Sequence, residues 1–393
     1  MWISLALCGC AGAGSMQGSG PTGPGGLTGS GALRAPLALE PFSPRLEATV
    51  VDHPVVAIRL DDILSSQVLL DNDFERAVEG WVDYWRGPAA PAVPAFLGRM
   101  ASYGALVDSA IAARDLPQSL RYLPFIESGY NPGAASRASA VGMWQFMEAT
   151  ARERGLEVTA LLDQRRDPVR STEEALGFLS ELHDELGSWF WVLAAYNSGP
   201  NRVRRILRTY AGDAPPTDSL FWALRVHFPV ETRDFVPKLI GAVVVGTDPG
   251  AHGYEPTVVD PFRFDEVSVP DATTLDVVAR AAGVPPAEIE RLNPEYVRRM
   301  TPPGRASMLR VPLGQGEIFE VAYAQIPPEE RVSFVMHRIL EGETLSHIAL
   351  RYGVRVADIE GANPGVRARF LRVGRTLTVP VAPSARSVQT TGG

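Results

Sequence analysis

The sequence predicts a mostly α-helical domain followed by two small α+β modules, each with the order strand, helix, helix, strand. Two observations predict the helical domain. Apolar residues recur at spacings of three and four from residue 72 onward, and the stretch WFWVLAAYN at 189–197 is apolar on every side. A repeat near the C-terminus, with a constant offset of 70 residues, indicates the two modules.

The first predicted helix begins near residue 72. Its apolar residues recur along one face: Phe74, Val78, Trp81, Val82 and Trp85. Two more helices are expected between residues 97 and 127, separated at Leu116-Pro117, with Gly129 as the C-terminal stop of the second. Glu127 is therefore expected at the end of an apolar helix.

A capping-box signature predicts the start of a later helix, because Ser171 is followed three residues later by Glu174. That helix has one apolar stripe, formed by Leu176, Leu179, Leu182 and Leu186. We expect the helical domain to span residues 72–247. The segment 248–261, rich in proline and glycine, is the expected linker at its end.

The repeat places one module at 262–313 and a second at 333–381. Positions match in one register: Leu275 with Leu345, Gly283 with Gly353, Asn293 with Asn363, and Gly304 with Gly374. Thr344 is expected to cap the helix LSHIALRY, and the segment 326–332 links the copies. The first copy departs from the second, with Ala272 in place of Gly342 and two extra residues near its end.

The N-terminal segment has a different character. Residues 1–10 are apolar and are expected to be a signal segment, and residues 11–50 are expected to be a flexible tether because glycine, serine and proline dominate its first part. Cys10, with Gly9 before it and Leu7 three residues earlier, resembles a bacterial lipoprotein cleavage box and is the candidate lipidation site. The alternative is a random apolar start with idle cysteines. Residues 382–393 are expected to form a disordered tail.

Composition argues against several functional classes. A net charge of −8 does not favour nucleic-acid binding, which needs a basic face. The only cysteines are Cys8 and Cys10, and none of the six histidines forms an H-E-x-x-H pair. We therefore expect no cofactor and no metal site.

Five motifs, in order, carry a resemblance to a known family: ESGYNP, GMWQF, GL…D.RRDP..ST.EAL, AAYNSGP.RV and PVETRDFVPKL. Residues 116–247, which contain them, resemble the lytic murein transglycosylases of the goose-type-lysozyme group, in particular the membrane-bound D type. The two modules resemble LysM domains, the second more closely. The resemblance implies a lysozyme-like catalytic domain acting on peptidoglycan, in an outer-membrane lipoprotein that faces the periplasm.

Glu127 in the first motif is the candidate catalytic acid. Glycosidic bond cleavage needs a carboxylic acid that keeps its proton near neutral pH. The negative end of a helix dipole, together with desolvation by Phe125, Ile126 and Trp144, would favour the protonated form. The alternative is an ordinary solvated acid at a helix terminus.

A conventional glycosidase needs a second carboxylate about 5–10 Å from the acid. No short motif supplies one: Asp163 and Asp167 are expected to cap helices or to pair with arginines, and Glu231 lies in a motif of its own. The resemblance implies that the substrate takes this role. Its N-acetyl group stabilises the cation, its C6 hydroxyl attacks, and Glu127 acts first as acid and then as base, leaving a 1,6-anhydro product.

The resemblance also implies the substrate-binding residues. Tyr196 and Asn197 match positions that orient the glutamate and the sugar, although Tyr196 also suits a core position. Ser136 and Gln145 match positions that hydrogen-bond the acetamido and sugar groups.

Other positions of the motifs are assigned less directly. Gly142 and Met143 are expected to form a cleft wall, with plain packing as the alternative for Met143. Trp144 suits either the core or a sugar-stacking platform. Phe235 departs from the family pattern, which has tyrosine there, and receives no catalytic role.

Three functions remain open at this point. The first is a lytic transglycosylase that cleaves the bond between N-acetylmuramic acid and N-acetylglucosamine, tethered to a membrane by lipid and directed to peptidoglycan by its LysM-like modules. The second is a muramidase that hydrolyses the same bond, and the third is a non-catalytic peptidoglycan-binding scaffold. In the second module seven arginines oppose four acidic residues, and this net charge of +3 suits an anionic wall. The first module is expected to be a degenerate copy.

Overall fold

The computed structural model describes residues 62–159, 161–255, 259–302, 304–331, 334–352, 354–363 and 365–380. The predictions made for residues 1–10, 11–50 and 382–393, including lipidation at Cys10, concern segments outside these residues. None of the described helices is long and apolar enough to cross a membrane.

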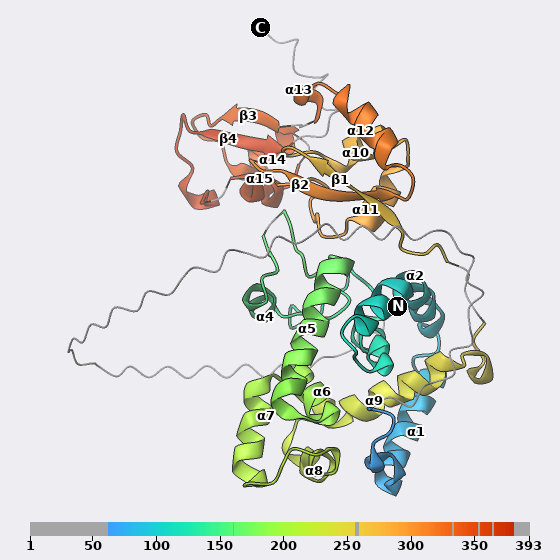
Figure 1. Cartoon of the computed structure of the whole chain (residues 1–393). Helices are drawn as coiled ribbons and strands as arrows, with labels where there is room; N and C mark the ends of the chain where they lie inside the picture. Colours follow the sequence, from blue (N-terminus) through green and yellow to red (C-terminus); the bar gives the residue numbers. More distant parts are fainter. Residues whose placement is uncertain are drawn as a thin grey trace, which may run out of the picture. The chain divides into compact units, whose positions relative to one another are not determined.

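Among the described residues from Gln67 to His252, all the named elements are helices, with a few isolated β-bridges between them (Figure 1). The α-helices are α1 Asn72–Arg86, α2 Val93–Ala112, α3 Leu123–Ser128, α4 Glu148–Glu153, α5 Pro168–Leu186, α6 Trp189–Ser198, α7 Pro200–Ile206, α8 Asp218–Leu224 and α9 Val230–Thr247. Short turns of other helix types are η1 Gln67–Leu70, η2 Gln118–Tyr122, η3 Leu207–Ala211, η4 Arg225–His227 and η5 Gly250–His252. The predicted break at Leu116-Pro117 is confirmed, although the segment after it begins with η2 before α3.

The predicted capping box at Ser171 is wrong. Helix α5 begins at Pro168, and Asp167 is its N-cap, accepting hydrogen bonds from the backbone N–H groups of Val169 and Arg170 at 2.9 and 3.2 Å. Ser171 lies inside the first turns and donates its hydroxyl to the Asp167 carbonyl oxygen. Aspartate followed by proline at the first helical position is the stronger start signal, because proline is preset for that position.

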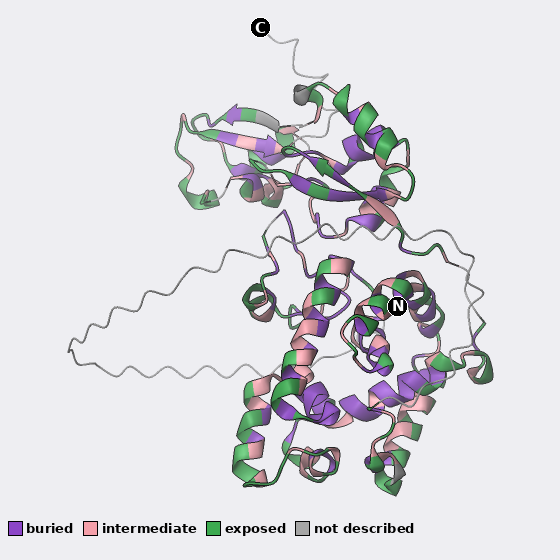
Figure 2. Ribbon diagram, in the orientation of Figure 1, coloured by how far each residue is buried: buried purple, intermediate pink, exposed green. Residues whose placement is uncertain are grey.

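The helices share one core. Helix α6 is buried from Trp189 to Ala195, as its uniform apolarity predicted, and the leucine stripe of α5 is also buried (Figure 2). Helix α9 packs against α1, α3 and α6. This arrangement brings the side chains of three helices to the end of the short helix α3, where the candidate acid lies.

The two repeat copies have the predicted order of elements. The first contains β1 Phe264–Val269, α10 Leu275–Ala282, α11 Pro286–Leu292 and β2 Ser307–Pro312. The second contains β3 Phe334–Arg338, α14 Leu345–Tyr352, α15 Val356–Ala362, the turn η6 Ala368–Phe370 and β4 Thr376–Pro380. In each copy the strands pair antiparallel, Phe264 opposite Pro312 and Phe334 opposite Pro380. The predicted fold class is confirmed.

Two details of the modules extend or confirm the sequence predictions. The Thr344 hydroxyl accepts a hydrogen bond from the His347 N–H at 3.2 Å, which confirms it as a cap of α14. Two helices lie outside the predicted pattern: α12 Gly316–Ala324, which packs Phe319 and Tyr323 into the core of the first module, and the short α13 Pro328–Arg331.

Buried ion pairs join the first module to the segment that precedes α5. The Arg310 guanidinium contacts the carboxylates of Asp167 at 2.8 Å and Glu295 at 3.1 Å, and all three side chains are less than one-tenth exposed. Leu162 lies in the apolar core of this module, and the Asp163 N–H donates to the Glu295 carbonyl oxygen. Asp167 is therefore both a helix cap and a partner of Arg310.

Candidate active site

Glu127 lies in the last turn of α3, one residue before its end. The preceding residues Leu123, Pro124, Phe125 and Ile126 are all buried. Gly129 ends the helix in the left-handed conformation with φ of 60°, and a Cβ atom there would meet the Phe96 ring at 2.3 Å. Only glycine fits such a backbone position beside a packed ring. The sequence therefore stops α3 where Glu127 is still helical and partly buried.

The surroundings of Glu127 favour its protonated form. Desolvation raises the pKa of Glu127 from 4.5 to about 7, with the Lys238 charge acting to lower it and the Glu231 charge acting to raise it. Among the residues that the structure describes, none is hydrogen-bonded to the Glu127 carboxyl group. A carboxylic acid with this pKa is half protonated at neutral pH and is free to meet an acceptor.

Helix α9 supplies both charges that act on Glu127. Lys238 donates a hydrogen bond from its ammonium group to the Ile126 carbonyl oxygen at 3.0 Å, and its nitrogen lies 5.7 Å from the centre of the Trp81 ring. Glu231, two turns earlier on α9, accepts a hydrogen bond from the Asn197 side-chain amide at 3.3 Å. The buried Phe235 lies between them in sequence and has no polar group to offer.

Tyr196 and Asn197, from the last turn of α6, point their polar atoms in different directions. The Tyr196 hydroxyl donates to the Trp144 carbonyl oxygen at 2.7 Å. Desolvation, with the Glu127 charge second, raises the pKa of the Tyr196 hydroxyl well above its usual value, so it stays a donor. The side-chain oxygen of Asn197 accepts a hydrogen bond from the Thr232 hydroxyl at 2.7 Å. This bond directs the side-chain NH2 group of Asn197 toward Glu231.

The segment 131–147 carries the other four residues predicted to bind substrate and is here called the substrate loop for that prediction. The Ser136 hydroxyl accepts from the Ala140 N–H at 3.0 Å, and the Gln145 amide donates to the Gly142 carbonyl oxygen at 2.8 Å. Gln145 has φ of 51°, a conformation that non-glycine residues rarely adopt and that is concentrated at functional sites.

Two apolar side chains of the substrate loop, Met143 and Trp144, face the core instead of a cleft. Met143 and Trp144 are fully buried, and the Trp144 indole N–H donates to the Thr172 hydroxyl at 2.9 Å. Of the two roles left open for Trp144, the core role is therefore correct. The Met143 carbonyl oxygen accepts from the Ser128 hydroxyl at 2.8 Å, which ties the loop to the residue after Glu127.

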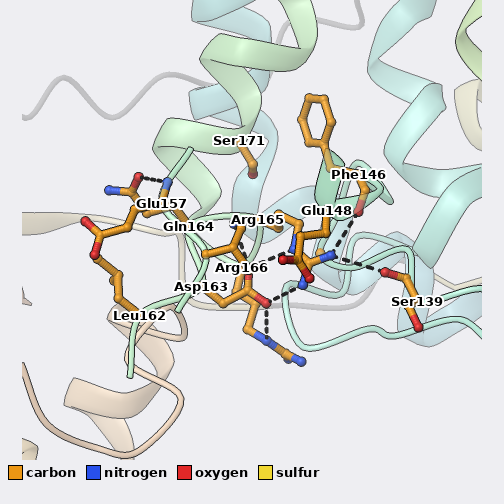
Figure 3. A network of polar contacts seen from close by, with 12 residues as sticks. Ser139, Phe146, Glu148, Glu157, Leu162, Asp163, Gln164, Arg165, Arg166 and Ser171 are labelled. Carbon is orange, nitrogen blue, oxygen red and sulfur yellow. Dashed lines mark hydrogen bonds and ion pairs between the residues drawn. The ribbon is translucent and has the colours of Figure 1, made fainter. Parts of the chain in front are cut away.

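Arg165 supports the substrate loop through hydrogen bonds to its backbone (Figure 3). Its guanidinium forms a buried two-bond pair with Asp163, each bond 2.9 Å long, and donates to the carbonyl oxygens of Ser139 and Phe146 at 3.1 and 3.4 Å. Gly142, with φ of 88°, packs so closely that a Cβ atom would lie 1.8 Å from the Arg165 carbonyl oxygen. The pairing predicted for Asp163 and the cap predicted for Asp167 are both confirmed.

The structure thus ties most of the predicted residues to one another. Ser136, Gly142, Met143 and Gln145 share one loop, which is tied to α3 through Ser128 and to α6 through Tyr196. Asn197 is directed instead to Glu231. From the sequence, Lys238 received no role, and Glu231 was assigned only to a motif of its own. The available signal was their spacing of seven residues, which puts both on one face of a helix.

Three family models match successive parts of the chain. Residues 108–215 match the transglycosylase SLT domain, residues 263–328 match the LysM-like domain of the lytic transglycosylase MltD, and residues 337–380 match the LysM domain. Three successive parts of the chain are thus similar to an SLT transglycosylase domain, an MltD LysM-like domain and a LysM domain.

Among curated proteins the chain is homologous to membrane-bound lytic murein transglycosylase D of Escherichia coli strain K12. The two are 32% identical over 290 residues, which are 70% of this chain and 63% of that protein. The chain thus spans less than two thirds of the length of this relative. A putative tributyltin chloride resistance protein of Alteromonas sp. strain M-1 is 36% identical over 107 residues, 27% of this chain and 52% of that protein.

Two solved structures with partial similarity are both of lytic transglycosylases. The 70 kDa soluble lytic transglycosylase SLT70 from Escherichia coli has a TM-score of 0.32 and 27% identity, covering 39% of this chain and 25% of that one. A complex of the 70-kDa soluble lytic transglycosylase with bulgecin A has a TM-score of 0.34 and 22% identity, covering 52% of this chain and 33% of that one.

Proposed function

We propose that this protein is a peptidoglycan lytic transglycosylase that cleaves the β-1,4 bond between N-acetylmuramic acid and N-acetylglucosamine and releases 1,6-anhydro products. The observation that carries the proposal is the environment of Glu127, whose pKa is raised to about 7 by desolvation at the end of an apolar helix. The transglycosylase domain match over residues 108–215, which includes Glu127, supports the same activity.

The proposed mechanism uses one protein carboxyl group twice. Glu127 gives its proton to the glycosidic oxygen, and the bond from that oxygen to C1 of the muramic acid breaks with its electron pair leaving on the glucosamine. The acetamido group of the muramic acid stabilises the resulting cation. The C6 hydroxyl then bonds to C1 and returns its proton to Glu127, so that the enzyme is regenerated without water.

A tethered hydroxyl has an entropic advantage over water. Well-oriented intramolecular attack has an effective molarity of up to about 10⁵–10⁸ M, which is far above the concentration of any external nucleophile. The role that we assign to the substrate loop is to hold the sugar in that orientation. Ser136, Gln145 and the backbone at Gly142 would line it on one side, with Tyr196 and Asn197 on the other, whereas the Met143 side chain faces the core.

Hydrolysis is the second candidate, and Glu231 is the observation that favours it. Asp163 is neutralised by Arg165 in a buried pair, so it is a poor candidate for a base. Glu231 is exposed, and its charge acts on Glu127. A water molecule activated by Glu231 would make the protein a muramidase.

Product analysis separates the two reactions. Sacculi are digested in heavy-oxygen water and the soluble fragments are weighed. Transglycosylation gives unlabelled muramic termini that lack a reducing end and are about 18 Da lighter than hydrolysed ones. Stoichiometric label at those termini would establish hydrolysis instead.

The Glu127→Gln variant tests whether the protein is an enzyme or a scaffold. The variant removes the proton and little volume, so cleavage should be lost while binding to sacculi remains. A decrease of less than about tenfold would exclude Glu127 as the acid, because general acid catalysis is worth roughly 10²–10⁴ in rate. Equal and negligible clearing of sacculi by both proteins would favour the scaffold.

We assign the remaining roles by the same reasoning. The LysM domain at 337–380 would bind peptidoglycan strands. Homology to a membrane-bound protein supports a place in the bacterial cell envelope, with lipid attached at Cys10 as the proposed anchor. Loss of the protein from membranes in the Cys10→Ser variant, but not in Cys8→Ser, would support this anchor, and the absence of acyl mass on Cys10 would exclude it.

A further inference from the structure

We propose that Lys238 is a positioning residue for the cleavage reaction, whose ammonium group fixes the last turn of α3 and stabilises the Glu127 carboxylate after its proton has been given away. The inference rests on the proposed function and adds a residue to its machinery. Lys238 is also the only lysine in the chain, so every other side chain with a permanent positive charge is an arginine.

The contact between Lys238 and α3 is directed at the end of the helix. The ammonium nitrogen lies 3.0 Å from the Ile126 carbonyl oxygen. The last carbonyl groups of a helix have no partner within the helix and carry the negative end of its dipole. A cation bound there stabilises the helix end, and here that end carries Glu127 as the next residue.

Lys238 is held in place by contacts with α3 and α1. Its ammonium group lies 5.7 Å from the centre of the Trp81 ring of α1, within the range of a cation–π interaction. One turn further along α9, Gly241 allows close packing, because a Cβ atom there would lie 2.9 Å from the Trp81 Cβ atom. The side chain therefore has little freedom to move away from α3.

The charges around Lys238 balance only when Glu127 is protonated. Glu127 faces it from α3 and Glu231 from its own helix, while Trp81 of α1 is neutral and Tyr196 of α6 faces Glu127. With Glu127 protonated, Lys238 and Glu231 cancel each other. Loss of the proton leaves one uncompensated negative charge. The ammonium group lowers the free energy of the ionised Glu127 carboxylate in this desolvated place. Burial alone would hold the proton too tightly for a good donor.

Arg99 offers a matched control. It donates from Nε to the Gly129 carbonyl oxygen at 2.6 Å, so it also binds the end of α3. Glu127 is acted on by Lys238 and Glu231 but not by Arg99. Substitution of Arg99 therefore removes a hydrogen bond to the end of α3 without removing a charge that shifts the pKa of Glu127.

The experiment measures the pH dependence of cleavage of soluble glycan strands by the full chain and by Lys238→Met, Lys238→Arg, Glu231→Gln and Arg99→Met. Because the acid must be protonated, activity falls as pH rises through the pKa of Glu127, and this fall forms the alkaline limb of the pH–rate profile. Loss of the ammonium charge should move this limb to higher pH by about one unit or more and lower the plateau rate at least about tenfold. Lys238→Arg should restore most of both.

The two control variants should behave differently from Lys238→Met. Glu231→Gln removes a negative neighbour and should move the limb to lower pH. Arg99→Met should lower thermal stability and leave the limb in place. An unchanged limb in Lys238→Met, or an equal shift in Arg99→Met, would overturn the proposal and leave Lys238 a structural residue.

A second measurement does not depend on activity. The pKa of Glu127 is followed by NMR of carbon-labelled glutamate side chains in the full chain, with Glu127→Gln to assign the signal. A higher pKa in the folded Lys238→Met or Lys238→Gln variant supports the role of the lysine even if no cleavage is detected. Absence of cleavage by the wild-type chain would count against the proposed function alone.

Discussion

The Tyr196 hydroxyl donates a hydrogen bond of 2.7 Å to the carbonyl oxygen of Trp144 and so fastens the substrate loop to α6. The two residues are 52 positions apart in the sequence. This bond, with the one from Ser128 to the Met143 carbonyl oxygen, ties the loop to α6 and α3 at the two residues directly before Gln145.

Removal of the Tyr196 hydroxyl should loosen the loop. In Tyr196→Phe the Trp144 carbonyl oxygen loses its donor in a partly buried place, which should cost about 1–3 kcal/mol in the free energy of unfolding. Turnover should fall because Gln145 is no longer held. Denaturant unfolding and glycan turnover check these effects. The exposed Tyr210 supplies the control, and a Tyr210→Phe variant that lost as much stability as Tyr196→Phe would contradict the explanation.

Replacement of Glu127, the proposed catalytic acid, should stabilise the protein at alkaline pH. The pKa of Glu127 is about 7 in the folded chain and 4.5 without its surroundings, so between these values the folded state holds a proton that the unfolded state has lost. Stability therefore falls as pH rises through this window, and the loss is complete above pH 7. Glu127→Gln escapes the loss. Its gain in melting temperature over the wild type should be larger at pH 8 than at pH 4, and an equal gain at both would refute the assignment.

Removal of the Arg310 charge should destabilise the protein strongly. Asp167 and Glu295 would be left as buried carboxylates without their partner, and breaking a buried ion pair on one side typically costs about 3–5 kcal/mol. Arg305 pairs with Glu157 at the surface, so Arg305→Met should cost less than about 1 kcal/mol. Chemical denaturation of Arg310→Met and Arg305→Met measures the difference. Similar losses in the two variants would show that burial of the Arg310 cluster contributes little.

Deletion of residues 333–393 should weaken binding to sacculi and spare turnover of short soluble glycans. The second module has its own apolar core, formed around Ile348, Ile359 and Leu377. None of its described residues is among those that contact or act on Glu127. Co-sedimentation with sacculi and a soluble-substrate assay give the two readouts. If the shortened and full chains sediment equally, the second module is not the wall-binding part.

Local patterns in the sequence predicted most of the fold. The apolar stripe of α5, the uniform apolarity of α6 and the repeat each depend on residues close together in the chain, and the structure has the corresponding elements. The capping box at Ser171 failed for a local reason as well, because Asp167 and Pro168 provide a better start to the same helix.

Contacts between distant residues could not be predicted in this way. Lys238 reaches Ile126 across 112 positions, and Arg310 reaches Asp167 across 143. Nothing in the neighbourhood of either residue in the sequence shows its partner. Glu127 could be selected from its motif, but the balance of Lys238 and Glu231 around it depends on how α9 packs against α3, which is a property of the tertiary structure.

The buried cluster of Arg310, Asp167 and Glu295 has a consequence for cooperativity. The cap of α5 and the core of the first module share these charges, and Leu162 lies in that core, so neither side can unfold while the other keeps its partners. Residues 62–328 should therefore melt in a single step, and the second module, with a separate apolar core, in another. Calorimetry would then record two heat-absorption peaks for a chain in which three segments match separate family models. An expression fragment that ended at residue 262 would lack part of the cooperative unit it was meant to isolate.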